Sequence, residues 1–186
     1  MLNLLRVFSA ILVLAAIATQ LTIHIIAGFS IINFFSYFTN LSNLIAALVF
    51  IGATQAITNN YNFDNDFWRA QSAINMSVVG IVFVTLLRSA DLGALLPWVN
   101  FVLHYLMPIV VLFEWLLNPP KQRFGLRDAL LCQIFPVLYL AYTMIRGALI
   151  GWYPYPFLTQ NTLAVIQALR HILLAFAAFS WLLQLY

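Results

Sequence analysis

Long runs of apolar residues set the strongest constraint on what this chain can fold into. A helix needs about 20 apolar residues to cross the hydrocarbon core of a bilayer. Six windows of that length occur, at about 4–28, 32–56, 69–90, 97–117, 127–149 and 161–185. Only 7% of the residues are charged, against about a quarter in a soluble domain. The pattern predicts an all-α integral membrane bundle of six transmembrane helices, with residues 1–186 forming a single domain.

The first window also has features of a secretory signal peptide. Arg6 precedes the apolar run, and Ala16-Ile17-Ala18 has the small-residue pattern of a cleavage site. The apolar run continues to Ile26, however, which is longer than the apolar region of a signal peptide. We therefore interpret this window as the first spanning helix.

The few cations indicate orientation rather than nucleic-acid binding, because the formal net charge is only +3. Cytoplasmic loops of membrane proteins carry an excess of Lys and Arg. The cations on the side shared by the N-terminus and the even-numbered loops are Arg6, Arg69, Lys121, Arg123 and Arg127. Only Arg88 and Arg146 lie near the other side. This distribution predicts that both termini are cytoplasmic.

A polar stretch interrupts the second window. The stretch contains no glycine, proline or charged residue. Its polar side chains are Ser36, Tyr37, Thr39, Asn40, Ser42 and Asn43. Such groups are costly at membrane depth unless they find partners or serve a chemical purpose. We expect the helix to continue through this stretch. The spacing of Ser36, Thr39 and Asn43 would then place them on one helix face.

The fourth window brings a histidine to the same depth. Thr39 and His104 each lie about seven residues, or roughly 10 Å, from the outer ends of their windows. Asn100 precedes His104 by four residues and shares its face. Pro108 lacks the N–H that would bond the carbonyl of His104, which predicts a kink beside the histidine, and Pro136 should act similarly in the fifth window.

This arrangement suggests a nucleophile and a base. A hydroxyl nucleophile needs a base to take its proton, and a neutral imidazole is the usual one. Thr39 is the candidate nucleophile and His104 the candidate base, while Ser36, Asn43 or Asn100 can orient the imidazole or donate to an oxyanion. The competing interpretation is structural, because a threonine in a spanning helix most often bonds its own backbone.

Other ionisable side chains fall in the same outer half of the bundle. They are His24, Arg88, Arg146, Arg170 and His171. The arginines either snorkel to the interface or receive the carboxylate of a fatty-acid-like ligand. No spacing of histidines, carboxylates or glycines is typical of a metal or nucleotide site, so we expect no metal and no cofactor. Glu114, near the inner end of the fourth window, is expected to be solvated or paired with an interfacial Lys or Arg.

Three short patches resemble the androgen-induced protein family of small multi-helix membrane proteins. They are Ser36-Tyr37-Phe38-Thr39, the segment from Asn100 to His104 followed by Pro108 and Glu114, and Trp152-Tyr153-Pro154-Tyr155-Pro156-Phe157-Leu158. Animal members of that family hydrolyse fatty acid esters of hydroxy fatty acids. The resemblance implies that Thr39 is the nucleophile, that His104 is its general base, and that this chain is a remote prokaryotic member located in a bacterial inner membrane.

These observations lead to one expectation and two alternatives. The expectation is an intramembrane hydrolase of a lipid ester, with a lipid or fatty-acid-like substrate, the bilayer as its surroundings and no nucleic-acid partner. The first alternative is a lipid-binding or transport protein whose polar layer grips a head group without cutting it. The second is a structural bundle in which the polar layer holds helices together. The oligomeric state is left open.

Overall fold

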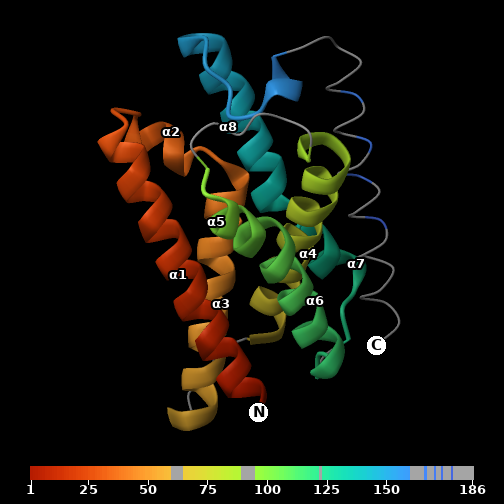
Figure 1. Ribbon diagram of the computed structural model, residues 1–186. Coiled ribbons are helices and arrows are strands. Elements are labelled where there is room, and N and C mark those ends of the chain that lie inside the picture. The colour runs from red at the N-terminus through yellow and green to blue at the C-terminus, as the bar shows by residue number, and fades with distance from the viewer. Residues whose placement is uncertain are drawn as a thin grey trace.

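The computed structural model of the chain describes residues 1–59, 65–88, 95–121 and 123–159, together with the single positions Ile166, Arg170, Leu173 and Ala177. Every regular element in these ranges is a helix, and the long helices pack side by side as a bundle (Figure 1). Five helices are long and apolar enough to cross a membrane: Leu2–Ile26, Phe38–Gln55, Asp66–Leu87, Pro97–Leu117 and Leu126–Ile150. Five of the six predicted windows thus have a helical counterpart, whereas most of 161–185 lies outside the described residues.

Several of the long helices are built from shorter pieces. The first half of the chain forms α1 (Leu2–Ile26), α2 (Ile31–Phe35), α3 (Phe38–Asn59), α4 (Asn65–Val82) and the π-helical turn η1 (Phe83–Leu87). The next span consists of α5 (Pro97–Phe101), the π-helical turn η2 (Val102–Leu106) and α6 (Met107–Leu117). The remaining elements are α7 (Leu126–Leu131), α8 (Ile134–Ile150) and the short 3-10 turn η3 (Pro156–Leu158).

The second predicted helix is not continuous. It breaks at Ser36, between the end of α2 and the start of α3. Side chains occupy the carbonyls that an unbroken helix would use. The Asn40 amide donates to the carbonyl of Phe34 at 2.8 Å, and the Tyr139 hydroxyl donates to the carbonyl of Ser36 at 2.8 Å. A new helix therefore starts at Phe38, and the amides of its first turn need partners from outside the helix.

Both prolines that were expected to perturb helices lie at irregular points. Pro136 has no N–H to offer the carbonyl of Cys132. The helix breaks there between α7 and α8, and the side-chain amide of Gln71 on α4 donates to the free carbonyl at 2.9 Å. Pro108 follows directly after the π-helical turn η2.

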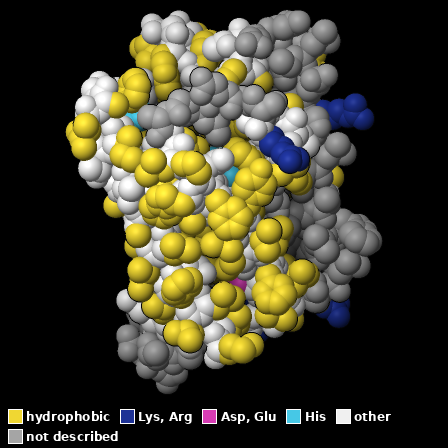
Figure 2. Space-filling view, viewed as in Figure 1, with side chains coloured by type: hydrophobic (Ala, Val, Ile, Leu, Met, Phe, Trp, Pro, Cys, Tyr) yellow, Lys and Arg dark blue, Asp and Glu magenta, His cyan; other side chains and the backbone are white. Residues whose placement is uncertain are grey.

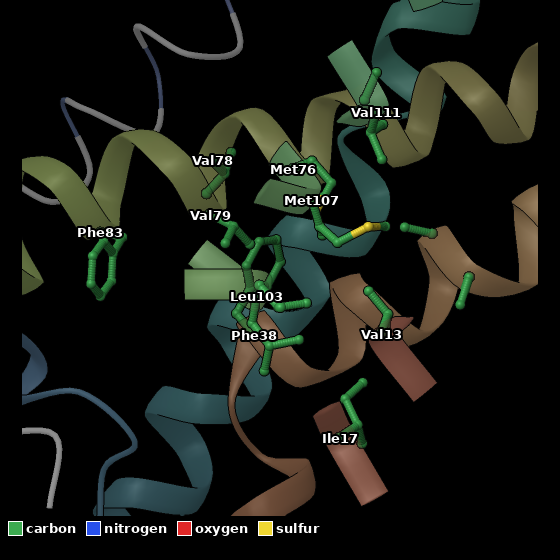
Figure 3. Packing of buried hydrophobic residues seen from close by; sticks show 14 of the residues in the cluster. Val13, Ile17, Phe38, Met76, Val78, Val79, Phe83, Leu103, Met107 and Val111 are labelled. Atoms are coloured by element: carbon green, nitrogen blue, oxygen red, sulfur yellow. The ribbon is translucent and has the colours of Figure 1, made fainter. Parts of the chain in front are cut away.

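The apolar core lies where α1, α3, α4 and the η2–α6 segment meet. Figure 3 shows Val13, Met76, Leu103 and Met107 converging from these elements, and all four are buried. Small residues line the same contacts: Ala10, Ala16, Ala46, Ala47, Ala53, Ala70 and Ala73 are buried. Small side chains let helix backbones approach closely, as in membrane bundles. At Gly80 the approach is so close that a Cβ would lie 3.3 Å from Cβ of Pro108.

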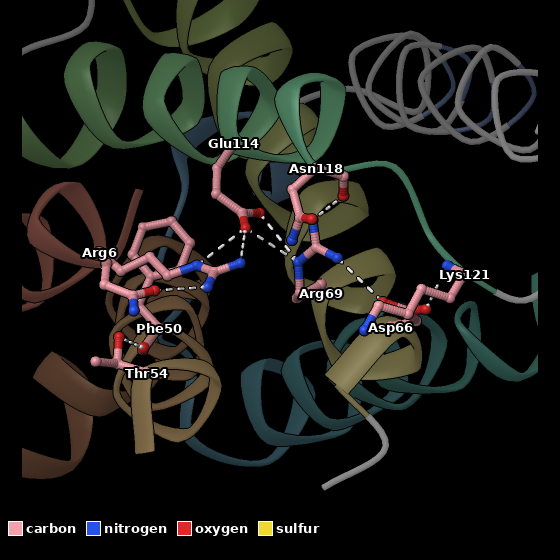
Figure 4. A network of polar contacts seen from close by, with 9 residues as sticks. Arg6, Phe50, Thr54, Asp66, Arg69, Glu114, Asn118 and Lys121 are labelled. Atoms are coloured by element: carbon pink, nitrogen blue, oxygen red, sulfur yellow. Dashed lines mark hydrogen bonds and ion pairs between the residues drawn. The ribbon is translucent and has the colours of Figure 1, made fainter. Parts of the chain in front are cut away.

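Buried charges join α1, α4 and α6 at the end of the bundle that holds the N-terminus (Figure 4). Glu114 accepts from Nε of Arg6 and from Nε of Arg69, each at 3.1 Å. Arg69 also pairs with Asp66 at 3.0 Å. The expectation that Glu114 pairs with an arginine is confirmed, but it is only 1% exposed and not solvated. Arg6 and Arg69, interpreted from the sequence as topology signals, are equally buried.

Candidate active site

Thr39 and His104 meet inside the bundle. Thr39 Oγ1 lies 3.3 Å from Nε2 of His104, although the two residues stand far apart in the chain. Each is only 7% exposed, so water screens their interaction poorly. The predicted match in depth between these side chains is therefore confirmed by a hydrogen bond between them.

The backbone fixes the tautomer of the imidazole. His104 Nδ1 lies 3.2 Å from the carbonyl oxygen of Asn100, which can only accept a hydrogen bond. Nδ1 therefore carries the proton, and Nε2 presents its lone pair to the Thr39 hydroxyl. Asn100 was one of three residues expected to orient the imidazole or donate to an oxyanion, and its main-chain carbonyl rather than its side chain contacts the ring.

The hydroxyl of Thr39 differs from four other threonine hydroxyls in the described helices. Four others donate to the carbonyl one turn earlier in their own helix: Thr19, Thr22, Thr54 and Thr85. Thr39 is the second residue of α3, so one turn back its chain is interrupted by the break at Ser36. Its hydroxyl faces His104 instead of its own backbone. This observation disfavours the structural interpretation of Thr39.

Two tyrosines satisfy the amides at the start of α3. The N–H of Phe38 donates to the Tyr139 hydroxyl at 3.1 Å, and the N–H of Thr39 donates to the Tyr155 hydroxyl at 3.3 Å. Helix N-termini leave such donors without intrahelical partners. The phenols therefore act as caps that hold the turn carrying the candidate nucleophile.

His104 sits in the π-helical turn η2 and stacks on a ring from α4–η1. The His104 and Phe83 ring centroids are 4.2 Å apart with an interplanar angle of 25°. π-Helical turns are rare and frequently occur at functional sites. The stacked ring and the Asn100 carbonyl together restrict the imidazole to one orientation.

Asn43 connects the two halves of the site. The N–H of Met107 bonds the carbonyl of Val102, and Pro108 has no N–H, so the carbonyl of Leu103 lacks a helical donor. The Asn43 amide donates to that carbonyl at 3.1 Å and to the carbonyl of Thr39 at 2.9 Å.

Both amide hydrogens of Asn43 are thereby used. The suggestion that Asn43 orients the imidazole or donates to an oxyanion is therefore wrong for this structure, and its role is to hold α3 against η2.

Ser36 lies outside the dyad. Its hydroxyl donates to the carbonyl of Ile32 at 2.7 Å and lies 2.9 Å from the Tyr142 hydroxyl. The expectation that Ser36 shares a helix face with Thr39 and Asn43 is wrong, because the break separates it from α3.

The candidate cations are scattered. Arg146 donates to the Asn33 side chain at 2.6 Å, and its guanidinium carbon lies 4.9 Å from the centroid of the Trp152 ring. Arg88 is exposed at the end of η1, and Arg170 is helical and exposed. None of the three forms a described contact with the dyad.

The other two histidines do not complete the site. His24 Nε2 lies 2.9 Å from the carbonyl oxygen of Ser30, at the end of α1. His171 lies outside the described residues. Within the described ranges, no three His, Cys, Asp or Glu side chains come together as metal ligands would.

The loop after α8 contributes Tyr155, whose hydroxyl accepts the N–H of Thr39. The loop is held against α8 at Gly147, where a Cβ would come within 2.1 Å of the Tyr153 ring. Tyr155 also makes an edge contact with Tyr37, with centroids 5.6 Å apart. The sequence signals for this role were the dense aromatic composition of 152–157 and its place in the third patch of the family resemblance.

Burial keeps the phenols of Tyr155 and Tyr37 protonated. It raises the pKa of Tyr155, although the hydrogen bond from the Thr39 amide partly opposes the effect. Burial likewise raises the pKa of Tyr37. Both phenols therefore carry their protons at neutral pH and can donate hydrogen bonds.

Comparisons of the chain with protein-family models, with curated proteins and with solved structures gave no match. The assignment of a function therefore depends on the geometry around Thr39 and His104.

Proposed function

We propose that this protein is an intramembrane hydrolase of a lipid ester, with Thr39 as nucleophile and His104 as general base. The observation that carries the proposal is the 3.3 Å contact between the Thr39 hydroxyl and an imidazole nitrogen whose lone pair faces it. Nucleophile, base and an orienting group for the base are the three parts that such catalysis requires. Here the orienting group is the Asn100 carbonyl, 3.2 Å from Nδ1.

The reaction proceeds through an acyl-enzyme. His104 Nε2 takes the proton of Thr39 as Oγ1 attacks the ester carbonyl, and the imidazolium returns it to the departing alcohol. Water then attacks the threonyl ester, with His104 again as base. The burial of both side chains strengthens these proton transfers, because little water competes for the hydrogen bonds.

The exposed surface supports a membrane location. Figure 2 shows hydrophobic side chains over α1 and the α5–α6 segment, with Lys and Arg toward the right of the view. Large exposed apolar side chains on the long helices include Leu4, Phe8, Ile11, Phe101, Ile109, Phe113, Leu138, Ile145 and Leu149. Apolar patches of this extent mark a membrane or partner surface. We propose six spans, the sixth at 161–185, with both termini in the cytoplasm of a bacterium.

The substrate class follows from chemistry and resemblance together. We propose a fatty acid ester of a hydroxy fatty acid or a similar lipid, as the likeness to the androgen-induced protein family implies. Rings connect the dyad to Arg146: Tyr155 contacts Tyr37, which contacts Trp152, which lies under the guanidinium. Arg146 is thus the best-placed of the three arginines to receive a free carboxylate.

Separate Thr39→Ala and His104→Ala variants test the mechanism against a panel of lipid esters. We expect each to lower turnover by about 10³-fold or more, because neither member acts without the other. Thr19→Ala is the matched control, since Thr19 bonds only its own helix in the described contacts, at 2.8 Å from Ala15, and should keep wild-type turnover.

Wild-type turnover in both site variants would contradict the mechanism. A protein that turns over no ester, is not labelled at Thr39 by an ester-mimicking probe, and yet gains thermal stability from added lipid would be the lipid-binding alternative.

A further inference from the structure

The phenol of Tyr155 is placed where an ester-cleaving threonine needs a hydrogen-bond donor. It accepts the N–H of Thr39 at 3.3 Å, which places the phenol beside the residue that carries the candidate nucleophile. The first turn of a helix carries a partial positive charge, which favours negative charge beside it. The phenol therefore lies next to the attacking oxygen and at the positive end of α3.

Tyr139 caps the same turn but uses its hydroxyl differently. It accepts the N–H of Phe38 at 3.1 Å and donates its proton to the carbonyl of Ser36 at 2.8 Å. Among the described residues, no backbone carbonyl accepts the proton of Tyr155. In the described hydrogen bonds the Tyr155 hydroxyl accepts the Thr39 N–H and donates to no atom. The Tyr155 proton can thus be redirected to a substrate, whereas the Tyr139 proton is committed.

We infer that Tyr155 is a catalytic residue that donates a hydrogen bond to the oxyanion formed when Thr39 attacks the ester. The inference rests on the proposed hydrolase function. The oxygen that becomes negative is bonded to the same carbon that Oγ1 attacks, so it develops beside Oγ1, within the neighbourhood of this phenol. Donors that are already in position at that oxygen stabilise the transition state more than the ground state.

The step balances as follows. Thr39 Oγ1 forms a bond to the carbonyl carbon, its proton moves to His104 Nε2, and the π electrons of the carbonyl move onto oxygen. Tyr155 donates a hydrogen bond to that oxygen and keeps its proton. On collapse the electrons return, the bond to the leaving alkoxide breaks, and the alkoxide takes the proton from the imidazolium.

The loop that carries Tyr155 is rigid enough for this role. Its ring stacks on Phe157 with centroids 5.2 Å apart and an interplanar angle of 4°. The Tyr37 ring packs edge-on against the Tyr155 ring, and the Tyr153 ring fills the space over Gly147. A donor held this way loses little freedom when the oxyanion forms, which is what makes such a donor effective.

The test uses an alkyl fluorophosphonate, whose phosphoryl oxygen occupies the oxyanion position in the covalent adduct, together with p-nitrophenyl octanoate. We expect Tyr155→Phe to slow labelling of Thr39 by about 100-fold and to lower kcat similarly, with KM little changed. Tyr139→Phe is the matched comparison, because it removes the other phenol that caps the same turn. Its labelling rate and kcat should fall at least about tenfold less than those of Tyr155→Phe, since Tyr139 holds the turn but donates nothing to the oxyanion. The thermal stabilities of the two variants should fall about equally.

The outcomes separate the two proposals. Wild-type activity in both Thr39→Ala and His104→Ala overturns the hydrolase mechanism itself. If those variants are inactive while Tyr155→Phe is labelled within about threefold of the wild-type rate, the hydrolase proposal stands and the role of Tyr155 is wrong. The same conclusion follows if the labelling rates of Tyr155→Phe and Tyr139→Phe fall equally.

A second variant covers the case in which Tyr155→Phe does not fold. Incorporating 3,5-difluorotyrosine at position 155 keeps the ring and hydroxyl but makes the phenol more acidic. A phenolate cannot donate, so the labelling rate should fall as pH rises through the pKa of the fluorinated phenol, where wild type shows no fall. A pH profile identical to wild type overturns the inference.

Discussion

At the scale of single residues, the site is built by giving partners to backbone groups that the helices leave free. The Asn40 amide occupies the Phe34 carbonyl, and the Tyr139 hydroxyl occupies the Ser36 carbonyl. These bonds interrupt the helix and turn the Thr39 hydroxyl away from its own backbone. Asn43 fills the Leu103 carbonyl that Pro108 leaves unpaired. An unpaired buried carbonyl is costly, so these polar side chains stabilise an irregular backbone.

Replacement of Asn43 tests this account. Asn43→Leu keeps a similar size but leaves the Leu103 carbonyl buried without a donor, so we expect a loss of about 1–3 kcal/mol in unfolding free energy. Ester turnover should also fall, because α3 and η2 lose the bond that holds Thr39 against His104. Unfolding in detergent micelles measures the first effect.

Ser77→Ala serves as the comparison for Asn43→Leu. The Ser77 hydroxyl bonds the Ala73 carbonyl within its own helix at 2.8 Å, and its removal should change stability by less than about 0.5 kcal/mol. Equal stability of the two variants would show that the Asn43 bridge contributes nothing.

At the scale of elements, the buried charges determine how α1, α4 and α6 meet. One carboxylate, Glu114, accepts from two guanidinium groups on two other helices, and all three side chains are at most 2% exposed. Removing one member of such a group leaves uncompensated buried charge, whereas removing all of them does not. The cluster lies at the opposite end of α6 from η2, so it aligns the segment that carries His104.

Glu114→Gln should therefore lower the unfolding free energy by about 3–5 kcal/mol, because the buried Arg6 loses its described charge partner and the buried Arg69 keeps only Asp66. The triple variant Arg6→Met, Glu114→Leu, Arg69→Met should recover most of that loss. Thermal unfolding in detergent measures both. A triple variant less stable than Glu114→Gln would show that the charges contribute through interactions that apolar packing cannot replace.

At the scale of the whole molecule, the apolar surface of the long helices is compatible with a membrane location. Large apolar side chains are exposed along these helices, as on the face seen in Figure 2. Cys132, the single cysteine of the chain, is buried, so the wild-type protein gives a low background for thiol labelling.

Cysteine labelling tests the proposed topology. In bacterial cells, a membrane-impermeant maleimide should label Phe29→Cys in intact cells and Lys121→Cys only after permeabilisation, because the basic end faces the cytoplasm. The reverse pattern would show an inverted protein. Labelling of both variants in intact cells would contradict a spanning arrangement.

The sequence by itself determined the helical class, the five long apolar helices and the common depth of Thr39 and His104. Apolar length and proline position act locally, and depth follows from counting along rigid helices. Only the tertiary structure decided the break at Ser36, the Asn43 bridge, the buried Arg6–Glu114–Arg69 cluster and the inward turn of Tyr155. Each of these depends on a partner distant in the chain, and residue patterns within one segment carry no information about which partner that will be.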